Sequence, residues 1–141
     1  MKRLLAAISF AALTVSAGAA DMATLTVTVE GVSAKGGDLR VGLFDAKTFP
    51  VRGSKAINGA VVTAKEGKMD VMLQGILPGE YGVKVLDDEN ANGVMDLRMG
   101  MFPAEPYGFS NDAKPHMGPP KWDDAKIVLK PGANAITIHL K

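Results

Sequence analysis

The stretch 77-LPGEYGVKVLD-87 decides the fold, because a turn that carries a tyrosine leads directly into a β-strand. Leu-x-Gly-x-Tyr just before a strand is the pattern of a tyrosine corner, found in Greek-key β-sandwiches. In such a corner the Tyr81 hydroxyl bonds back to nearby backbone, while its ring packs in the core. The stretch therefore predicts a sandwich strand over residues 81–87 and a structural role for Tyr81.

Alternation of apolar and polar residues extends the strand prediction in both directions. Leu25, Val27 and Val29 alternate with threonines, which is typical of a half-buried strand. The sequence predicts about seven short strands and no convincing helix. The predicted strands are residues 24–30, 39–44, 60–65, 69–74, 81–87, 125–130 and 134–141. Hairpins are expected at Glu66-Gly67 and at Pro131-Gly132. The predicted fold class is all-β: a single antiparallel β-sandwich, immunoglobulin-like or transthyretin-like, with one long ordered loop.

The first 20 residues have the order of a secretory signal peptide. Lys2 and Arg3 precede an apolar run, and the small residues 17–19 fit a signal-peptidase site. The run is shorter than the roughly 20 apolar residues of a membrane span, so cleavage near residue 19 or 20 is expected. Residues 21–141 would then form one β-sandwich domain without a membrane span, in the periplasm or outside the cell.

Charge and composition limit the expected partners. Removing Lys2 and Arg3 changes the count from 16 basic and 15 acidic side chains to 14 and 15, a formal charge of −1. A nearly neutral chain gives no reason to expect a nucleic acid or an anionic membrane surface as partner. The chain has no cysteine, and the remaining roughly 120 residues are enough for a core without disulfides.

Residues 97–122 form an unusually long irregular stretch. Loops beyond about 12–15 residues are uncommon in compact domains, and they are functional or disordered. A disordered segment is poor in aromatics, but this one contains Phe102, Tyr107, Phe109 and Trp122. We therefore expect an ordered loop that packs over the sandwich as a lid of the core. The alternative is a platform, built from residues 102–122, that binds a glycan or a peptide partner.

The stretch 88-DENANGVMD-96 follows a calcium-loop pattern through nine positions. In such a loop, oxygen ligands come from positions 1, 3 and 5, from a backbone carbonyl at 7 and from position 9, while Gly at 6 allows the turn. The candidate metal ligands are Asp88, Asn90, Asn92, the Val94 carbonyl and Asp96. A polar turn without metal is the alternative, because Asp and Asn favour turns and Asn-Gly is itself a turn signal.

The strongest ligand of a calcium loop is missing. Position 12, normally a bidentate Glu, is Met99. Asp87, Glu89 or Glu105 could supply a carboxylate from elsewhere. Only two of the candidate ligands are charged, so calcium binding is expected at about 10⁻⁴–10⁻³ M, as in extracellular modules.

Two motifs carry a resemblance to a known family. The first is the Asp-x-Asn-x-Asn-Gly-x-x-Asp loop of residues 88–96. The second comprises Gly100, Pro103, Glu105, Tyr107, Gly108, Phe109, Ser110, Asn111, Gly118, Pro119 and Pro120. In these positions the chain resembles the uncharacterised bacterial exported family called domain of unknown function 2141. Asp87 stands where that family often has His, which adds a possible ligand. The resemblance implies an exported β-sandwich and no established activity.

A periplasmic copper-binding protein is a further alternative. Thioether and imidazole ligands suit Cu(I), and the chain gathers such side chains in the long loop: Met95, Met99, Met101, His116 and Met117. Methionines among aromatics ordinarily serve packing, however.

Catalysis has less support. Ser110 lacks the Gly-x-Ser-x-Gly elbow, and His139 is expected on the solvated face of the last strand. Asp123 and Asp124 would point to opposite faces of a strand. The sequence therefore predicts an exported, non-enzymatic protein whose calcium-type loop pins the long aromatic loop.

Overall fold

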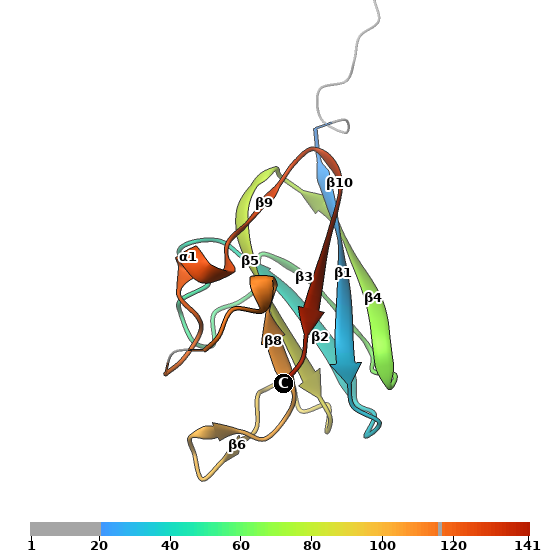
Figure 1. Cartoon of the computed structure of the whole chain (residues 1–141), viewed down its shortest axis with the longest axis vertical. Coiled ribbons are helices and arrows are strands. Elements are labelled where there is room, and N and C mark those ends of the chain that lie inside the picture. Colours follow the sequence, from blue (N-terminus) through green and yellow to red (C-terminus); the bar gives the residue numbers. More distant parts are fainter. Residues whose placement is uncertain (1–20, 116) are drawn as a thin grey trace, which may run out of the picture.

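The computed structural model describes residues 21–115 and 117–141, and β-strands dominate it (Figure 1). The strands are β1 (Ala23–Val32), β2 (Asp38–Phe44), β3 (Asn58–Thr63), β4 (Gly67–Ile76), β5 (Gly79–Asp88), β6 (Leu97–Arg98), β7 (Phe102–Pro103), β8 (Tyr107–Phe109), β9 (Ile127–Leu129) and β10 (Gly132–His139). The helical elements of these ranges are the 3-10 turn η1 (Ser110–Asp112) and the single turn α1 (Trp122–Ala125). The predicted signal peptide and His116 lie outside the described residues.

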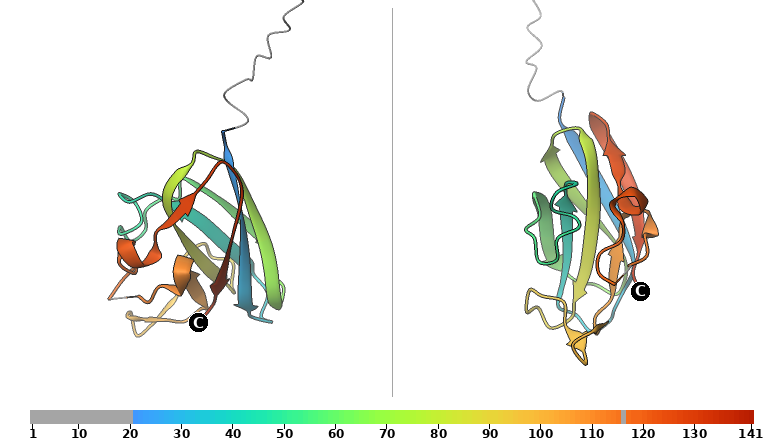
Figure 2. Two further views of the ribbon diagram at one scale, coloured as in Figure 1. Left: turned by 45° about the horizontal axis from the view of Figure 1, so that its top comes forward. Right: turned by 90° about the vertical axis from the view of Figure 1, so that its left-hand side faces the viewer.

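Two sheets make up the sandwich. One has the order β10-β1-β4, and the other has the order β3-β2-β5-β8 with β9 beside β5. β1 pairs with β4 in antiparallel orientation. It pairs with β10 in parallel orientation, and in that pairing Ala23 lies opposite Gly132. β1 and β10 run side by side in the views of Figures 1 and 2. The all-β sandwich is confirmed, with one parallel pair that the sequence did not indicate.

Both predicted hairpins are wrong. β3 pairs with β2 whereas β4 pairs with β1, so the turn at Glu66-Gly67 carries the chain from one sheet to the other. In the same way β9 pairs with β5 whereas β10 pairs with β1, so Pro131-Gly132 also joins the two sheets. The turn chemistry was identified correctly, because Gly67 and Gly132 both have positive φ. A turn residue signals a change of direction, but the partner of the next strand depends on which face must be buried.

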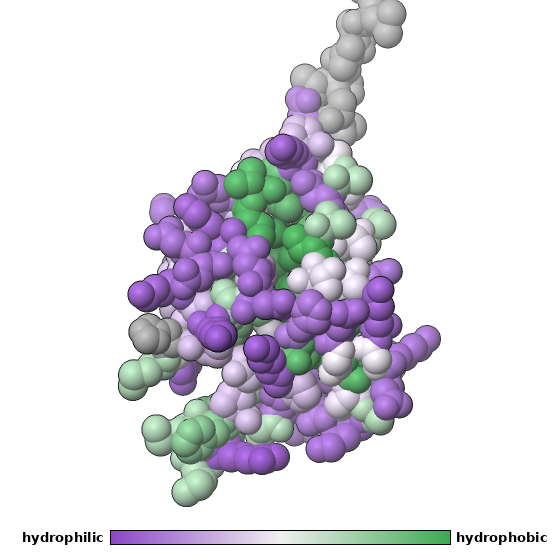
Figure 3. Space-filling model, viewed as in Figure 1, coloured by the Kyte–Doolittle hydropathy of each residue, from purple (hydrophilic) through white to green (hydrophobic). Residues whose placement is uncertain are grey.

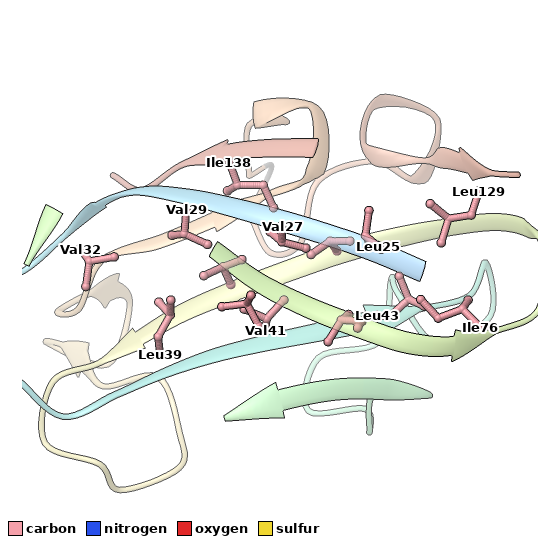
Figure 4. Close-up of a cluster of buried hydrophobic side chains, with 14 of the residues drawn as sticks. Leu25, Val27, Val29, Val32, Leu39, Val41, Leu43, Ile76, Leu129 and Ile138 are labelled. Carbon is pink, nitrogen blue, oxygen red and sulfur yellow. The ribbon is translucent and has the colours of Figure 1, made fainter. Parts of the chain in front are cut away.

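The core lies between the sheets because each long strand is apolar on one face. β1 buries Leu25, Val27 and Val29 completely, and the intervening threonines are half-buried. Figure 4 shows these side chains in one cluster with those from other strands of both sheets, among them Leu39, Val41, Leu43, Ile76, Leu129 and Ile138. The tyrosine corner is also confirmed, since the Tyr81 hydroxyl donates to the Leu77 carbonyl and its ring packs against this cluster.

The described part of the long loop, residues 97–115 and 117–122, is ordered, as predicted, and it packs on a second cluster. The Phe49 ring lies edge-on to Phe109 at 6.3 Å and to Trp122 at 5.8 Å between centroids. The buried Ser110 hydroxyl accepts from the Val83 amide at 2.9 Å and donates to the Ala125 carbonyl at 2.5 Å, which ties the loop to β5.

α1 corrects the prediction that Asp123 and Asp124 lie on a strand. Both occupy the first turn of α1, where carboxylates favour the helical conformation. No helix within residues 21–115 and 117–141 is long and apolar enough to cross a membrane.

Candidate functional site

Two neighbouring aspartates, Asp87 and Asp88, end β5 and point to opposite faces of its sheet. Side chains alternate along a strand, so Asp87 continues the inner face of Val83 and Val85 while Asp88 points to the outer face. Asp87 is paired in register with Leu39, a core residue of β2, and Asp88 is paired with Asp38. Both aspartates are fully buried, which is unusual for carboxylates unless they are paired.

Asp88 is paired with a guanidinium and with the backbone of its own loop. Its Oδ2 accepts from Arg40 Nε at 2.9 Å and from the Gly93 amide at 2.7 Å, while Oδ1 accepts from the Asn92 amide at 3.2 Å. Burial raises the pKa of Asp88, but Arg40 and the two amides outweigh it and leave the pKa below its ordinary value. The first predicted ligand is thus an ion-paired anchor that folds the polar loop (residues 88–96) back over β2.

Three of the other predicted ligands are side chains that converge. Asp96 Oδ2 accepts from Asn90 Nδ2 at 2.5 Å, and Asp96 Oδ1 accepts from Asn92 Nδ2 at 2.7 Å. The amide oxygens face the other way: Asn90 Oδ1 accepts from the Asn92 amide at 3.3 Å, and Asn92 Oδ1 accepts from the Val94 amide at 3.1 Å. The fifth predicted ligand, the Val94 carbonyl, belongs to an exposed residue at the edge of this arrangement.

Glu105 closes the polar loop without entering it as a ligand. This buried side chain accepts from the Glu89 amide at 2.7 Å and from the Asp96 amide at 3.0 Å, one through each carboxylate oxygen. It was one of three residues that could have replaced the missing Glu of position 12. The structure instead uses both of its oxygens to fasten the two ends of the polar loop.

Asp87 and Glu89 meet at a residue that the sequence did not single out. The Ser33 amide donates to Asp87 Oδ2 at 2.7 Å, and the Ser33 hydroxyl donates to Glu89 Oε2 at 2.6 Å. Burial raises the pKa of Asp87, the Ser33 amide lowers it, and the negative Glu89 raises it again, with a net shift upward. The turn after Ser33 lies close, since a Cβ on Gly37 would approach the Asp88 carbonyl oxygen to 2.1 Å. Gly37 is therefore required there, also because its φ is +84°.

Negative charge is in surplus at this end of the sandwich. Six carboxylates gather here: Asp38, Asp87, Asp88, Glu89, Asp96 and Glu105. Within the described residues, ion pairs reach them only from Arg40, at 2.9 Å and 3.6 Å, and from Lys35, at 3.9 Å. No group of three or more carboxylate or imidazole side chains is arranged as a metal site in those residues. A cation bound here would therefore also use amide, carbonyl or water oxygens.

Of the methionines of the copper alternative, Met95 is half-buried and the other three lie on the surface. The β6–β7 hairpin projects from the end of the molecule, and its apolar side chains gather in the space-filling view (Figures 2 and 3). Met99 is 91% exposed and Met101 is 75% exposed, with Phe102 beside them. Met117 is also fully exposed, and His116 lies outside the described residues.

The aromatic loop has the geometry of a lid rather than of an open platform. Trp122 and Phe109 are half-buried against Phe49, and the Tyr107 ring lies edge-on to Phe109 at 5.8 Å. Of the four aromatic side chains of this segment, Phe102 is the exposed one.

His139 is on the solvated side of β10, as expected, but it has two carboxylate partners. Its Nε2 lies 2.6 Å from Glu30 Oε2, and its Nδ1 lies 2.7 Å from Asp112 Oδ2. The side-chain bond and the charge of Asp112 raise the pKa of His139, and Glu30 adds to the increase. This cluster ties η1 to β1 and β10, and no local pattern in the sequence could have shown it.

Comparison with known proteins identifies the family. The profile described as an uncharacterised protein conserved in bacteria, DUF2141, matches residues 27–137. The match covers most of the chain, so the protein belongs to this family, as the two motifs within residues 88–120 indicated. Comparison with curated proteins and with solved structures gave no match.

Proposed function

We propose that this protein is exported and non-enzymatic, and that its polar loop binds calcium weakly and thereby fixes the segment between β5 and β8. The convergence of Asn90 and Asn92 on the Asp96 carboxylate carries the proposal, because it gathers three oxygen-bearing side chains in a loop of calcium-motif sequence. In the part of the chain that the structure describes, no ion pair reaches Asp96 or the nearby Glu105, so their negative charge favours a cation at this place. Export rests on the signal-like sequence of residues 1–20.

Calcium binding competes with the hydrogen bonds of the loop itself. Both asparagine amides direct nitrogen at Asp96, while their oxygens accept from backbone amides. A calcium ion beside Asp96 requires oxygen on that side, so both amide groups must turn over by about 180°. The ligands would then be both amide oxygens, the Asp96 carboxylate, the Val94 carbonyl and Asp88 Oδ1. Breaking the existing hydrogen bonds costs binding free energy, so a weak dissociation constant of about 10⁻⁴–10⁻³ M is expected.

The role of the ion would be structural. Glu105 and the polar loop hold the start of a long segment that continues into β8 and the aromatic lid. A ligand that binds only the folded state stabilises it by mass action. Calcium at ten times its dissociation constant would add about 1.4 kcal/mol to the free energy of unfolding, which corresponds to roughly 5 °C in Tm for a domain of this size.

The test is a calcium titration of chelator-treated protein, followed by calorimetry and by thermal unfolding. We expect binding heat and a higher Tm in millimolar calcium. Asp96→Asn should abolish both, because it removes the charged ligand that, unlike Asp88, has no ion pair within the described residues. Asp123→Asn is the matched control, since that side chain is 85% exposed and lies far along the chain on α1. Absence of both the heat and the Tm change in the unmodified protein would refute the proposal.

A further inference from the structure

Asp87 has an oxygen atom for which the described residues supply no partner. The side chain is fully buried, Oδ2 accepts from the Ser33 amide, and Oδ1 makes no hydrogen bond. Buried polar atoms in folded proteins nearly always have a partner, which can be protein, water or an ion. An unpaired carboxylate oxygen in the interior therefore requires a partner, which is a proton, a water molecule or an ion.

A second carboxylate, that of Glu89, lies close to Asp87 and acts on its charge. Glu89 belongs to the turn that directly follows β5. Both carboxylates also bond to one residue, Ser33, through its amide and its hydroxyl. The Glu89 side chain is 12% exposed, so it lies nearer the surface than the fully buried Asp87.

These two carboxylates bond to Ser33 and take no part in the cluster of Asn90, Asn92 and Asp96. Asp88 lies between them in sequence and points to the outer face, toward Arg40 and Gly93. The Asp87–Glu89 pair faces the turn between β1 and β2 instead. An ion held by Asp87 and an ion held by Asn90, Asn92 and Asp96 would therefore occupy different places.

The available basic side chains do not neutralise the pair. Arg40 is bonded to Asp88 on the other face. Lys35 reaches only Glu89, at 3.9 Å, and its side chain is 74% exposed. Two neighbouring carboxylates beside the Ser33 hydroxyl suit a hard divalent cation, which prefers oxygen ligands. Magnesium in particular binds through one or two carboxylates and keeps several waters.

We propose that Asp87 Oδ1 and the Glu89 carboxylate hold a hydrated divalent cation, magnesium or calcium, under the β1–β2 turn. The ion enters past Glu89, and Lys35 moves into solvent as it binds. The Ser33 hydroxyl keeps its bond to Glu89 and orients that carboxylate. The ion fastens β5 to the turn after β1 and thus joins the two sheets at this end of the sandwich.

Two backbone amides can report the two sites separately in a ¹⁵N NMR titration of the chelator-treated protein. The Ser33 amide donates to Asp87, and the Val94 amide donates to Asn92. Addition of millimolar magnesium or calcium, in separate titrations, should shift the Ser33 resonance. Asp87→Asn should abolish the Ser33 shift but keep any Val94 response to calcium. Asp96→Asn should do the reverse, and Asp123→Asn should change neither.

Thermal unfolding supplies a readout that does not depend on resonance assignment. In chelator, Asp87→Asn should unfold at a higher temperature than the unmodified protein, because it removes an unpaired buried charge. In millimolar cation, the unmodified protein should gain stability that the variant does not gain. Glu89→Gln, at the more exposed position, should also lose this gain and serves if Asp87→Asn does not fold.

A Ser33 resonance that responds to neither cation would overturn the second site, and so would a response that persists in Asp87→Asn. The partner of Asp87 would then be a proton or a bound water only. The calcium proposal for the polar loop would be unaffected, since its own readouts are the Val94 resonance and Asp96→Asn.

Discussion

The sandwich interior and the polar segment between β5 and β8 pair their backbone groups in different ways. In the interior, the amides of β1 are bonded to carbonyls of β4 and β10, and the side chains between the sheets are apolar. In the polar segment, four amides are bonded to carboxylates: Asp88 accepts those of Asn92 and Gly93, and Glu105 accepts those of Glu89 and Asp96.

This difference shows which interactions stabilise each of the two regions. Strand ladders and apolar burial respond little to the ionic surroundings, whereas buried carboxylates need a counter-charge or hydrogen-bond donors to remain ionised. The polar segment is therefore the region in which cations and protons are expected to act. Four predictions test whether the two regions are separable, from the largest expected effect to the smallest.

Leu25→Ala should cause the largest loss of stability. Leu25 is fully buried in β1, and a Leu→Ala change at such a site costs about 2–5 kcal/mol. Denaturant unfolding measures the loss, which should be the same with and without calcium because the cavity is apolar. Leu77→Ala, at a leucine that is 67% exposed, is the control. A calcium-dependent loss would mean that the two regions do not respond independently.

Glu105→Gln should loosen the polar segment and leave the interior intact. Glutamine keeps one acceptor oxygen but presents an NH₂ group to the second backbone amide, and an unsatisfied buried donor costs about 1–3 kcal/mol. Hydrogen exchange should show lost protection at the Glu89 and Asp96 amides. Glu80→Gln, on the exposed side of β5, is the control. Equal loss of protection in β1 would show that both regions unfold as one unit.

Tyr81→Phe should have a smaller effect within the sandwich. It removes only the hydroxyl that donates to the Leu77 carbonyl, and a single neutral hydrogen bond contributes about 0.5–1.5 kcal/mol. The ring remains packed, so urea unfolding should keep its slope and lose a little in midpoint. A loss as large as that of Leu25→Ala would give the corner a greater role than its single bond explains.

The pH dependence that comes from His139 should be the smallest effect, since the side chain is 53% exposed. Asp112 and Glu30 raise its pKa above the ordinary 6.5, so the protonated form stabilises the fold. This contribution is complete below pH 6.5 and is lost as pH rises through the raised pKa. The charged groups that face the imidazole are Asp112 and Glu30. Lys141 acts on it indirectly, because its charge lowers the pKa of Asp112. Tm should therefore fall slightly as pH rises above 6.5 and through the raised pKa of His139, and His139→Gln should flatten that part of the profile.

The elements that could be predicted from the sequence are those in which local pattern and burial agree. Alternation located β1 because Leu25, Val27 and Val29 face the core along one strand. The tyrosine corner was visible because both of its partners, Leu77 and Tyr81, lie within five residues. Strand pairing could not be read in this way, and the two wrong hairpins show that a turn signal carries no information on the partner strand.

The site was predicted in part for the same reason. Asn90, Asn92 and Asp96 belong to one local motif, and they do converge. The partners of the two aspartates come from far along the chain: Arg40 reaches Asp88 through the register of β2 and β5, and Ser33 reaches Asp87 from the end of β1. Such contacts are decided by tertiary packing and leave no signal in the spacing of residues.

The parallel pairing of β1 with β10 has a mechanical consequence. The ladder runs from Ala23 opposite Gly132 to Glu30 opposite His139, so the two ends of the described chain emerge at opposite ends of it (Figure 1). A force that pulls these ends apart loads the whole ladder in shear, and its hydrogen bonds must break together rather than one after another. Single-molecule stretching should therefore show one high rupture peak, whereas Ile136→Pro, which removes an amide from this ladder, should lower it. By contrast, a pull between β6 and β7 would peel a two-residue pairing and meet little resistance.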